Sequence, residues 1–230
     1  MIKKIIARLI FLLIIGTITS LSLHSQTHHQ MIGFKAGALY SNINEDDDTF
    51  QIFKDSKYKF GFGSNITYDY QMDDHSVIVT GLGYIQRGFY TMIVFTNEFG
   101  KTIGDGKIYY NYDYIEIPIK IKYQFGDKFK FYGFLGIAPN YLIKSNYHIP
   151  AIGNTVPEHT ENTTNDVAKI DFTGEIGLGI SYDIDEKFKI GLDFSYNHGT
   201  MTVTTKKYFD GIELVHYNFE SMIGVQYVIK

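Results

Sequence analysis

Hydrophobic and polar residues alternate along almost the whole chain after residue 30. In one segment, for example, Ile176, Leu178 and Ile180 alternate with Gly177 and Gly179. A period of two over many residues predicts β-strands with one apolar and one polar face. Eight such strands are predicted, at residues 31–41, 57–71, 76–91, 107–125, 129–144, 168–183, 187–204 and 214–229.

Long and short connections between these strands follow each other in strict alternation. The short ones are at 72–75, 126–128 and 184–186, and the long ones are at 42–56, 92–106, 145–167 and 205–213. Tight turns at the periplasmic end and longer loops outside are typical of transmembrane β-barrels. We therefore expect an all-β fold, an eight-stranded antiparallel transmembrane β-barrel, with both ends of the barrel domain on the periplasmic side.

The apolar face of each strand is expected to point outward, into lipid. The last three strands alone carry 18 large apolar residues on one parity, whereas a small barrel interior holds on the order of 12 packed side chains. Glycines such as Gly177 lie on the polar face of their strands. A residue without a side chain suits a crowded lumen, so this face is expected to point inward. Strands of about 9–11 residues cross a bilayer, and lipid does not tolerate open sheet edges. The barrel must therefore be closed.

The N-terminal segment has the features of a secretory signal peptide. A basic start that includes Arg8 precedes an apolar run ending at Ile15, and a cleavage site is predicted after Ser25. The run is shorter than the roughly 18 residues that a transmembrane helix needs. The chain is accordingly divided into a signal peptide at 1–25 and an outer-membrane β-barrel domain at 26–230.

Composition excludes several classes of function. The absence of cysteine rules out a disulfide framework, a thiolate metal site and a cysteine nucleophile. With 21 Lys and Arg against 25 Asp and Glu, no positive charge favours a nucleic acid as partner. Mean hydropathy is only −0.10 although aromatic residues make up 16% of the chain, a combination that suits amphipathic strands. The expected surroundings are the lipids of an outer membrane, and the expected state is a monomer.

Three segments are similar to a known family. Residues 114–123, with Tyr114, Glu116, Ile117 and Pro118 followed by Lys-Tyr, resemble the "Y-x-E-I-P…K-Y" strand of PorT-like outer-membrane β-barrel proteins. The segments 131–136 and 82–88 resemble the family's "F-x-G…G" and "L-x-Y-x-x-K-G" patterns, with arginine in place of the lysine. The resemblance implies an integral outer-membrane protein of a Gram-negative bacterium, in a family whose namesake is tied to protein secretion. The function that we expect is structural or accessory, through outer loops that meet a partner protein, glycan or envelope component, such as an envelope or secretion-system protein.

Candidate metal ligands are present but poorly spaced. The acidic run 45–48 supplies the carboxylates that Ca²⁺ prefers, without the alternating ligands and glycine of a calcium loop. His28 and His29 have no third ligand nearby, and His148 and His159 are separated by a long stretch of loop. No metal and no cofactor is therefore predicted.

A catalytic triad would require Ser195 and His216 to meet. Pairing the last two strands about residues 207–208 places Ser195 opposite Glu220 and His216 opposite Gly199, which separates serine from histidine by about 13 Å. Catalysis is therefore not expected. The alternatives are an outer-rim hydrolase or acyltransferase, and a small passive pore, although an eight-stranded lumen is only wide enough for its own side chains.

A set of charged residues lies on the polar faces of the predicted strands, at similar distances along the strands from the short turns. Unpaired charges in a narrow lumen would cost several kcal/mol, so we expect an internal network of ion pairs that plugs the barrel. The rival interpretation is a cluster of carboxyl groups that relays protons or binds a cation. The residues are Arg87, Glu116, Lys120, Lys122, Glu175 and Glu220.

Overall fold

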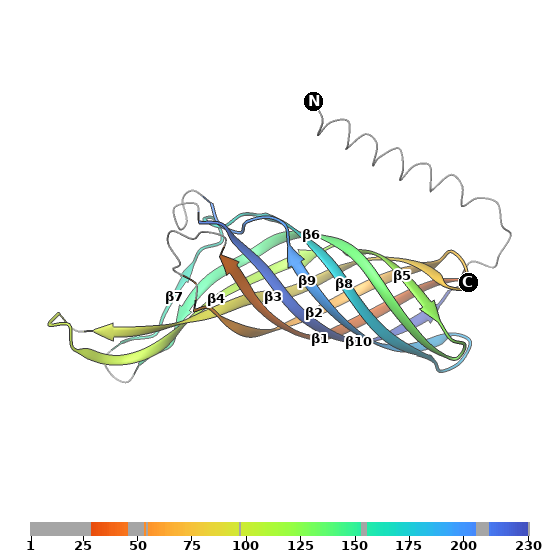
Figure 1. Cartoon of the computed structure of the whole chain (residues 1–230), viewed down its shortest axis with the longest axis horizontal. Helices are drawn as coiled ribbons and strands as arrows, with labels where there is room; N and C mark the ends of the chain where they lie inside the picture. The colour runs from red at the N-terminus through yellow and green to blue at the C-terminus, as the bar shows by residue number, and fades with distance from the viewer. Residues whose placement is uncertain are drawn as a thin grey trace, which may run out of the picture.

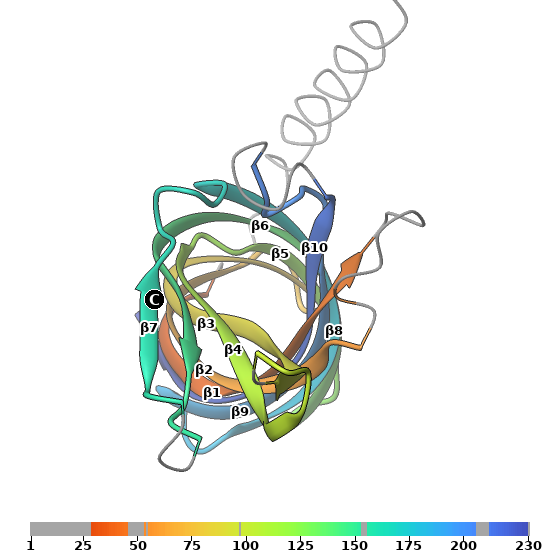
Figure 2. The same ribbon diagram turned by 90° about the vertical axis from the view of Figure 1, so that its left-hand side faces the viewer.

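The computed structural model shows a closed β-barrel (Figures 1 and 2). It describes residues 29–45, 53, 55–96, 98–152, 156–205 and 212–229. The predicted signal peptide lies outside these residues. The strands are β1 (Gln30–Glu45), β2 (Lys57–Gln71), β3 (Ser76–Thr96), β4 (Thr102–Glu116), β5 (Ile119–Phe125), β6 (Phe129–Ile149), β7 (His159–Asn162), β8 (Ile170–Asp183), β9 (Phe188–Gly199) and β10 (Leu214–Val228).

Nine of the ten described strands form the ring, and β7 lies outside it; because β4 and β5 share one position, the ring has eight positions, here called staves. Each stave pairs antiparallel with its neighbours, and the pairing of β1 with β10 closes the ring. β4 and β5 form one stave, because both pair with β3 on one side and with β6 on the other. The expected eight-stranded antiparallel barrel is confirmed.

The predicted continuous strand at 107–125 is interrupted at Ile117 and Pro118. Proline has no backbone N–H to donate to a neighbouring strand, so it weakens the ladder where it stands. Ile117 still donates its N–H to the carbonyl oxygen of Pro139, at 3.0 Å. The stave therefore continues through the break with only a local loss of pairing.

Strands extend further into the outer loops than the sequence pattern indicated. β3 and β4 pair from Gly83 and Glu116 up to Thr96 and Thr102, so most of the loop predicted at 92–106 is strand. The hairpin projects well beyond the barrel, at the left of Figure 1. β7 forms a second extension by pairing with the end of β6 alone. β9, in contrast, ends at Gly199 and not at the predicted residue 204.

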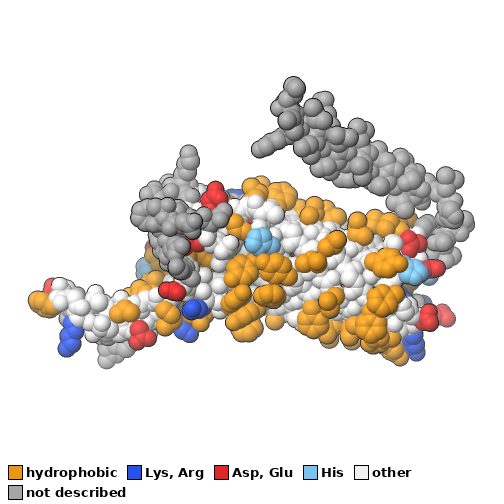
Figure 3. All heavy atoms as spheres, viewed as in Figure 1, with side chains coloured by type: hydrophobic (Ala, Val, Ile, Leu, Met, Phe, Trp, Pro, Cys, Tyr) orange, Lys and Arg blue, Asp and Glu red, His pale blue; other side chains and the backbone are white. Residues whose placement is uncertain are grey.

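The outer wall is apolar, as the alternation predicts. Large side chains such as Phe60, Ile121 and Leu178 are 73%, 63% and 64% exposed, and Figure 3 shows hydrophobic side chains covering the visible face of the barrel. Polar and charged residues of the opposite parity are buried inside. Among the described residues, no helix has the length and apolar character needed to cross a membrane.

Glycine inside the lumen makes room for aromatic rings. A Cβ atom at Gly177 would lie 2.3 Å from the ring of Phe134 and 2.5 Å from the carbonyl oxygen of Phe194. At Gly179 it would lie 2.5 Å from the ring of Tyr132. The rings of Phe134 and Tyr132 on β6 therefore lie over the backbone of the neighbouring strand β8, where a side chain at these positions would leave them no room.

Candidate functional site

All the charged residues that the sequence assigns to the lumen lie inside the barrel. Arg87 and Glu116 are each 1% exposed, and Glu175, Lys122 and Glu220 are also buried. The side chain of Lys120 is 13% exposed. The parity of the strands therefore places each of these groups correctly.

Arg87 links three staves across the lumen. Its Nη1 lies 3.0 Å from Oδ2 of Asp171 on β8, and its Nη2 lies 3.5 Å from Oε2 of Glu116 on β4. The guanidinium also lies 5.6 Å from the ring centroid of Tyr114. A planar guanidinium with several N–H donors can contact two carboxylates in this way, which an ammonium group does less well.

Lys120 is the centre of a second group of charges. Its Nζ lies 2.8 Å from Oε2 of Glu175 and 5.0 Å from the ring centroid of Phe134. Glu116 and Glu220 are also within electrostatic range of this ammonium. The structure thus brings the three predicted glutamates together around one lysine.

Two members of the expected network, Lys122 and Glu220, have partners outside the predicted six residues. Lys122 does not contact a glutamate; its Nζ lies 3.4 Å from Oδ2 of Asp69, which also accepts a hydrogen bond from Gln226 at 2.6 Å. Glu220 accepts a hydrogen bond from Asn197 at 3.3 Å, and no ammonium or guanidinium of the described lumen lies within 4 Å of it. The network therefore contains two ion pairs among the six predicted residues, Arg87–Glu116 and Lys120–Glu175, and extends to residues outside that set.

Four charged lumen residues were not predicted to belong to this network. Besides Asp69 and Asp171, these are Lys35 and Asp193, which form an ion pair to which the Tyr132 hydroxyl also donates a hydrogen bond. All four lie on the inward parity of their strands, so the alternation could have identified them. The half of the lumen nearer the short turns, here called the inner lumen, then contains six carboxyl groups and four basic groups among these described residues.

The outer half of the lumen is filled by aromatic and aliphatic side chains. Phe89 stacks on Tyr110 with ring centroids 4.5 Å apart, and His216 packs edge-on against Tyr112 at 4.6 Å. Phe53, from the β1–β2 connection, reaches down onto this cluster and contacts Phe89 at 5.4 Å between centroids. Three further buried residues of the cluster come from the ends of other long connections: Val167, Val203 and Ile212.

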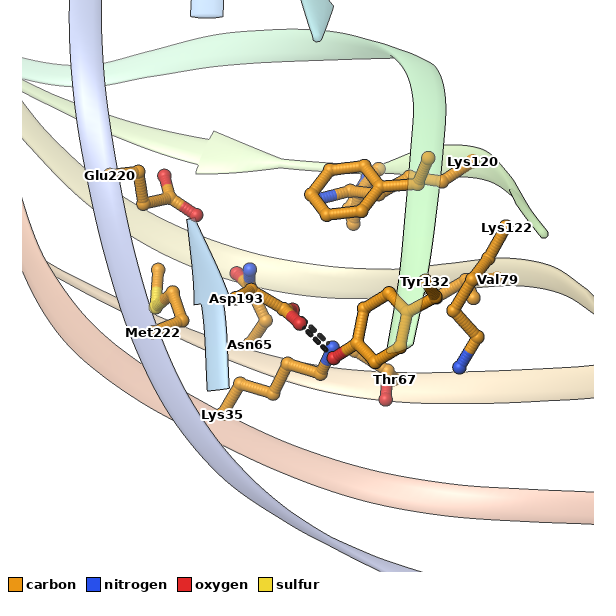
Figure 4. A pocket seen from close by; sticks show the side chains of 12 residues that line it. Lys35, Asn65, Thr67, Val79, Lys120, Lys122, Tyr132, Asp193, Glu220 and Met222 are labelled. Atoms are coloured by element: carbon orange, nitrogen blue, oxygen red, sulfur yellow. Dashed lines mark hydrogen bonds and ion pairs between the residues drawn. The ribbon is translucent and has the colours of Figure 1, made fainter. Parts of the chain in front are cut away.

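Little empty space is left between these side chains. A cavity among the charged side chains of the inner lumen measures about 20 Å³ and is lined by residues that include Lys35, Lys120, Lys122, Asp193 and Glu220. Figure 4 shows these side chains converging from opposite walls of the barrel. A volume of this size corresponds to about one water molecule.

The residues considered for catalysis do not assemble a triad. Ser195 lies opposite Glu220 in the ladder between β9 and β10, which confirms the predicted register. His216 is enclosed by the rings of Tyr112 and Tyr114 further toward the outer end. The structure thus places the serine among the charges and the histidine among the aromatic rings.

The candidate metal ligands form no centre among the described residues, where no three His, Asp or Glu side chains lie close enough to share an ion. Asp46–Asp48 and His28 lie outside those residues, and Glu45 accepts a hydrogen bond from the N–H of Phe53 at 2.8 Å. His148 and His159 lie on the paired strands β6 and β7, and each is within 4 Å of a glutamate.

Comparison with known proteins agrees with the fold. Residues 24–203 match the family described as outer membrane protein beta-barrel domain. A search of curated proteins found no match. The chain is similar to a major outer membrane protein from Thermus thermophilus, at 12% identity, with 89% of this chain and 100% of that chain covered and a TM-score of 0.53.

Two other solved structures are similar. The outer membrane protease OmpT of Escherichia coli is 9% identical, with 90% of this chain and 100% of that chain covered and a TM-score of 0.51. The attachment invasion locus protein Ail of Yersinia pestis is 15% identical, with coverages of 87% and 99% and a TM-score of 0.40. Likeness at these identities concerns the fold alone. The family match spans well over half of the sequence, and the chain is thus an outer-membrane protein that belongs to the outer membrane protein beta-barrel domain family.

Proposed function

We propose that this protein is a closed, non-catalytic barrel that acts through its outer loops as a structural or accessory component of the outer membrane. The observation that carries the proposal is the filled lumen, in which the cavity between the charged groups measures only about 20 Å³. A solute has no room to pass between the ion pairs of the inner half, and the aromatic cluster occupies the outer half. Interaction with other molecules is then left to the surface outside the membrane.

The β3–β4 hairpin is the most prominent part of that surface (Figure 1). Beyond Tyr90 and Tyr109, its two strands pair with each other and have no further partner strand among the described residues. Met92 and Val94 on one face are 51% and 62% exposed. A two-stranded hairpin is only marginally stable alone, so a partner that covers these side chains would stabilise it.

The PorT-like resemblance supports an envelope or secretion-system protein as that partner. Glu116 and Pro118 of the resembling strand lie where the structure gives them clear roles, in the network with Arg87 and at the break between β4 and β5. We infer that the chain is a PorT-like member of its family and that the barrel itself is a monomer. Its partner would meet the loops from outside the membrane.

Site-specific photo-cross-linking in intact cells tests this proposal. A photoreactive amino acid at Val94 should give a discrete adduct with one envelope protein, identified by mass spectrometry. The same group at Leu178, which is almost equally exposed but faces lipid, serves as the matched control and should give none. Adducts that are absent at Val94, or equal at both positions, would contradict a partner at the hairpin.

An activity screen separates this proposal from the rim enzyme. Purified protein is expected to show no turnover of lipid, ester or peptide substrates above the level of the Ser195→Ala and His216→Ala variants. Turnover that either substitution abolishes would replace the accessory role with a catalytic one.

A further inference from the structure

A glycine on β6 interrupts the apolar outer wall. Gly133 of β6 lies on the lipid-facing parity, between Phe131 and Leu135, which are 46% and 63% exposed. Its neighbours across the ladders are Tyr123 on β5 and Leu178 on β8, and both also point outward. Gly133 is therefore a gap surrounded by large side chains.

The gap opens into a groove of about 510 Å³ on the membrane face. Its walls include Ile121, Tyr123, Leu135 and Ile176, and its floor is formed where Phe134 and Gly177 meet behind Gly133. A Cβ atom at position 133 would meet nothing closer than the carbonyl oxygen of Gly177, at 3.7 Å. The backbone thus has room for a side chain at this position, and the glycine leaves that room empty.

One end of the groove lies near the short-turn end of the barrel. The ring of Tyr123 stacks on His75, in the turn between β2 and β3, with centroids 5.6 Å apart. Phe125, at the end of β5 next to the turn before β6, also lines the groove. Short turns mark the periplasmic side of an outer-membrane barrel, so the groove lies in the inner leaflet.

The occupant must be apolar and narrow. The groove is continuous with the lipid-facing wall, where water is excluded and acyl chains are the surrounding solvent. A second copy of the barrel does not fit the groove, because its wall is convex. The projecting side chains of Ile121, Leu135 and Leu178 would keep that wall from reaching the floor of the groove. Pockets of this volume with mainly apolar walls are typical of ligand sites.

We propose that the groove at Gly133 is a binding site for one acyl chain of an inner-leaflet phospholipid. The chain lies along Ile121 and Ile176 with its first carbons near Tyr123, and the headgroup is at the level of His75. Such a lipid is held longer than its neighbours in the membrane, because it buries methylene groups on three sides where they would otherwise meet only mobile chains.

Native mass spectrometry of the purified full-length barrel tests the site. The protein is mixed with phosphatidylethanolamine in detergent micelles and then released from the micelles. The wild type should retain one phospholipid, whereas Gly133→Leu should retain it about tenfold less, because a leucine takes the place of at least two methylene groups. Gly174→Leu is the matched control, since that lipid-facing glycine is equally open but does not line the groove.

A second variant guards against a folding defect in Gly133→Leu. Ile176→Ala removes one outward-facing wall of the groove and should also weaken retention, and heat-modifiable migration on gels checks that every variant is folded. Equal retention by the wild type, Gly133→Leu and Ile176→Ala would overturn the proposal. Failure of the wild type to retain a phospholipid would also overturn it. A dimer that forms in the wild type and is lost only in Gly133→Leu would overturn it too, because the occupant of the groove would then be a second copy of the chain.

Discussion

Among the individual side chains, Arg87 holds the inner lumen together most directly, since it contacts carboxylates on two other staves. Arg87→Met would leave Glu116 and Asp171 buried without their cation. We expect the substitution to lower the free energy of unfolding by about 3–5 kcal/mol, the usual cost of removing one partner of a buried ion pair. Urea unfolding of the protein in lipid vesicles measures this.

The control for Arg87 is Lys130 at the periplasmic rim, whose Nζ lies 2.7 Å from Asp183 in a partly exposed pair. Lys130→Met should cost less than Arg87→Met, because Asp183 keeps a second cation, the Nζ of Lys189 at 3.5 Å, and lies partly open to solvent. If Arg87→Met unfolds at the same urea concentration as Lys130→Met, the lumen network does not stabilise the barrel.

Glu220 and Glu175 should respond in opposite ways to neutralisation. Glu220 has no cation within 4 Å among the described residues, and it lies in a lumen with more carboxyl than basic groups. Glu220→Gln is therefore expected to unfold at the same or a higher urea concentration than the wild type. Glu175→Gln, which leaves Lys120 without its partner, should unfold at a lower one. The reverse order would show that Glu220 is the essential partner.

Residue parity predicted which groups face the lumen, but not which of them meet. Heights counted from the short turns suggested that Arg87 and the lysines pair with glutamates. Arg87 does contact Glu116, but it also reaches across the lumen to Asp171 on β8, and Lys122 reaches Asp69 on β2 in place of a glutamate. Contacts across the lumen depend on strand tilt and on the stagger between staves, and neither is contained in the pattern of a single strand.

At the level of strands, the alternation predicted every stave and the register of the last hairpin. Two of the differences from the predicted strands have identifiable causes. Pro118 interrupts hydrogen bonding inside an alternating segment, so one predicted strand becomes two. Most of the loop predicted at 92–106 is strand, and Ile152 packs against Gly104 and Gly106 in it, 3.0 and 2.3 Å from where their Cβ atoms would lie. Such contacts come from a distant loop, which a local pattern does not predict.

The topology of the hairpins predicts where protease can reach the barrel in living cells. Lys101, at the tip of the β3–β4 hairpin, should be cleaved by trypsin added to whole cells. Lys128 and Lys187, which are also exposed but lie in the opposite turns, should be cleaved only after the outer membrane is permeabilised. Mass spectrometry of the fragments distinguishes the sites, and cleavage at Lys128 in intact cells would mean that the barrel is inserted the other way round.

For the whole molecule, the division between signal peptide and barrel makes a simple prediction. The protein recovered from the outer-membrane fraction should begin at Gln26, because signal peptidase removes residues 1–25 before the barrel is assembled. N-terminal sequencing measures this directly. Recovery of the outer-membrane form with Met1 still present would contradict the predicted signal peptide.

The closed lumen is the property on which the proposed function most depends. Ion pairs fill its inner half, aromatic side chains fill its outer half, and the cavity between the charged groups has room for about one water molecule. Conductance of the purified wild-type barrel in a planar lipid bilayer tests this most directly. We predict no stepwise current under conditions in which a general porin conducts; stable openings of uniform size would show that ions cross the lumen.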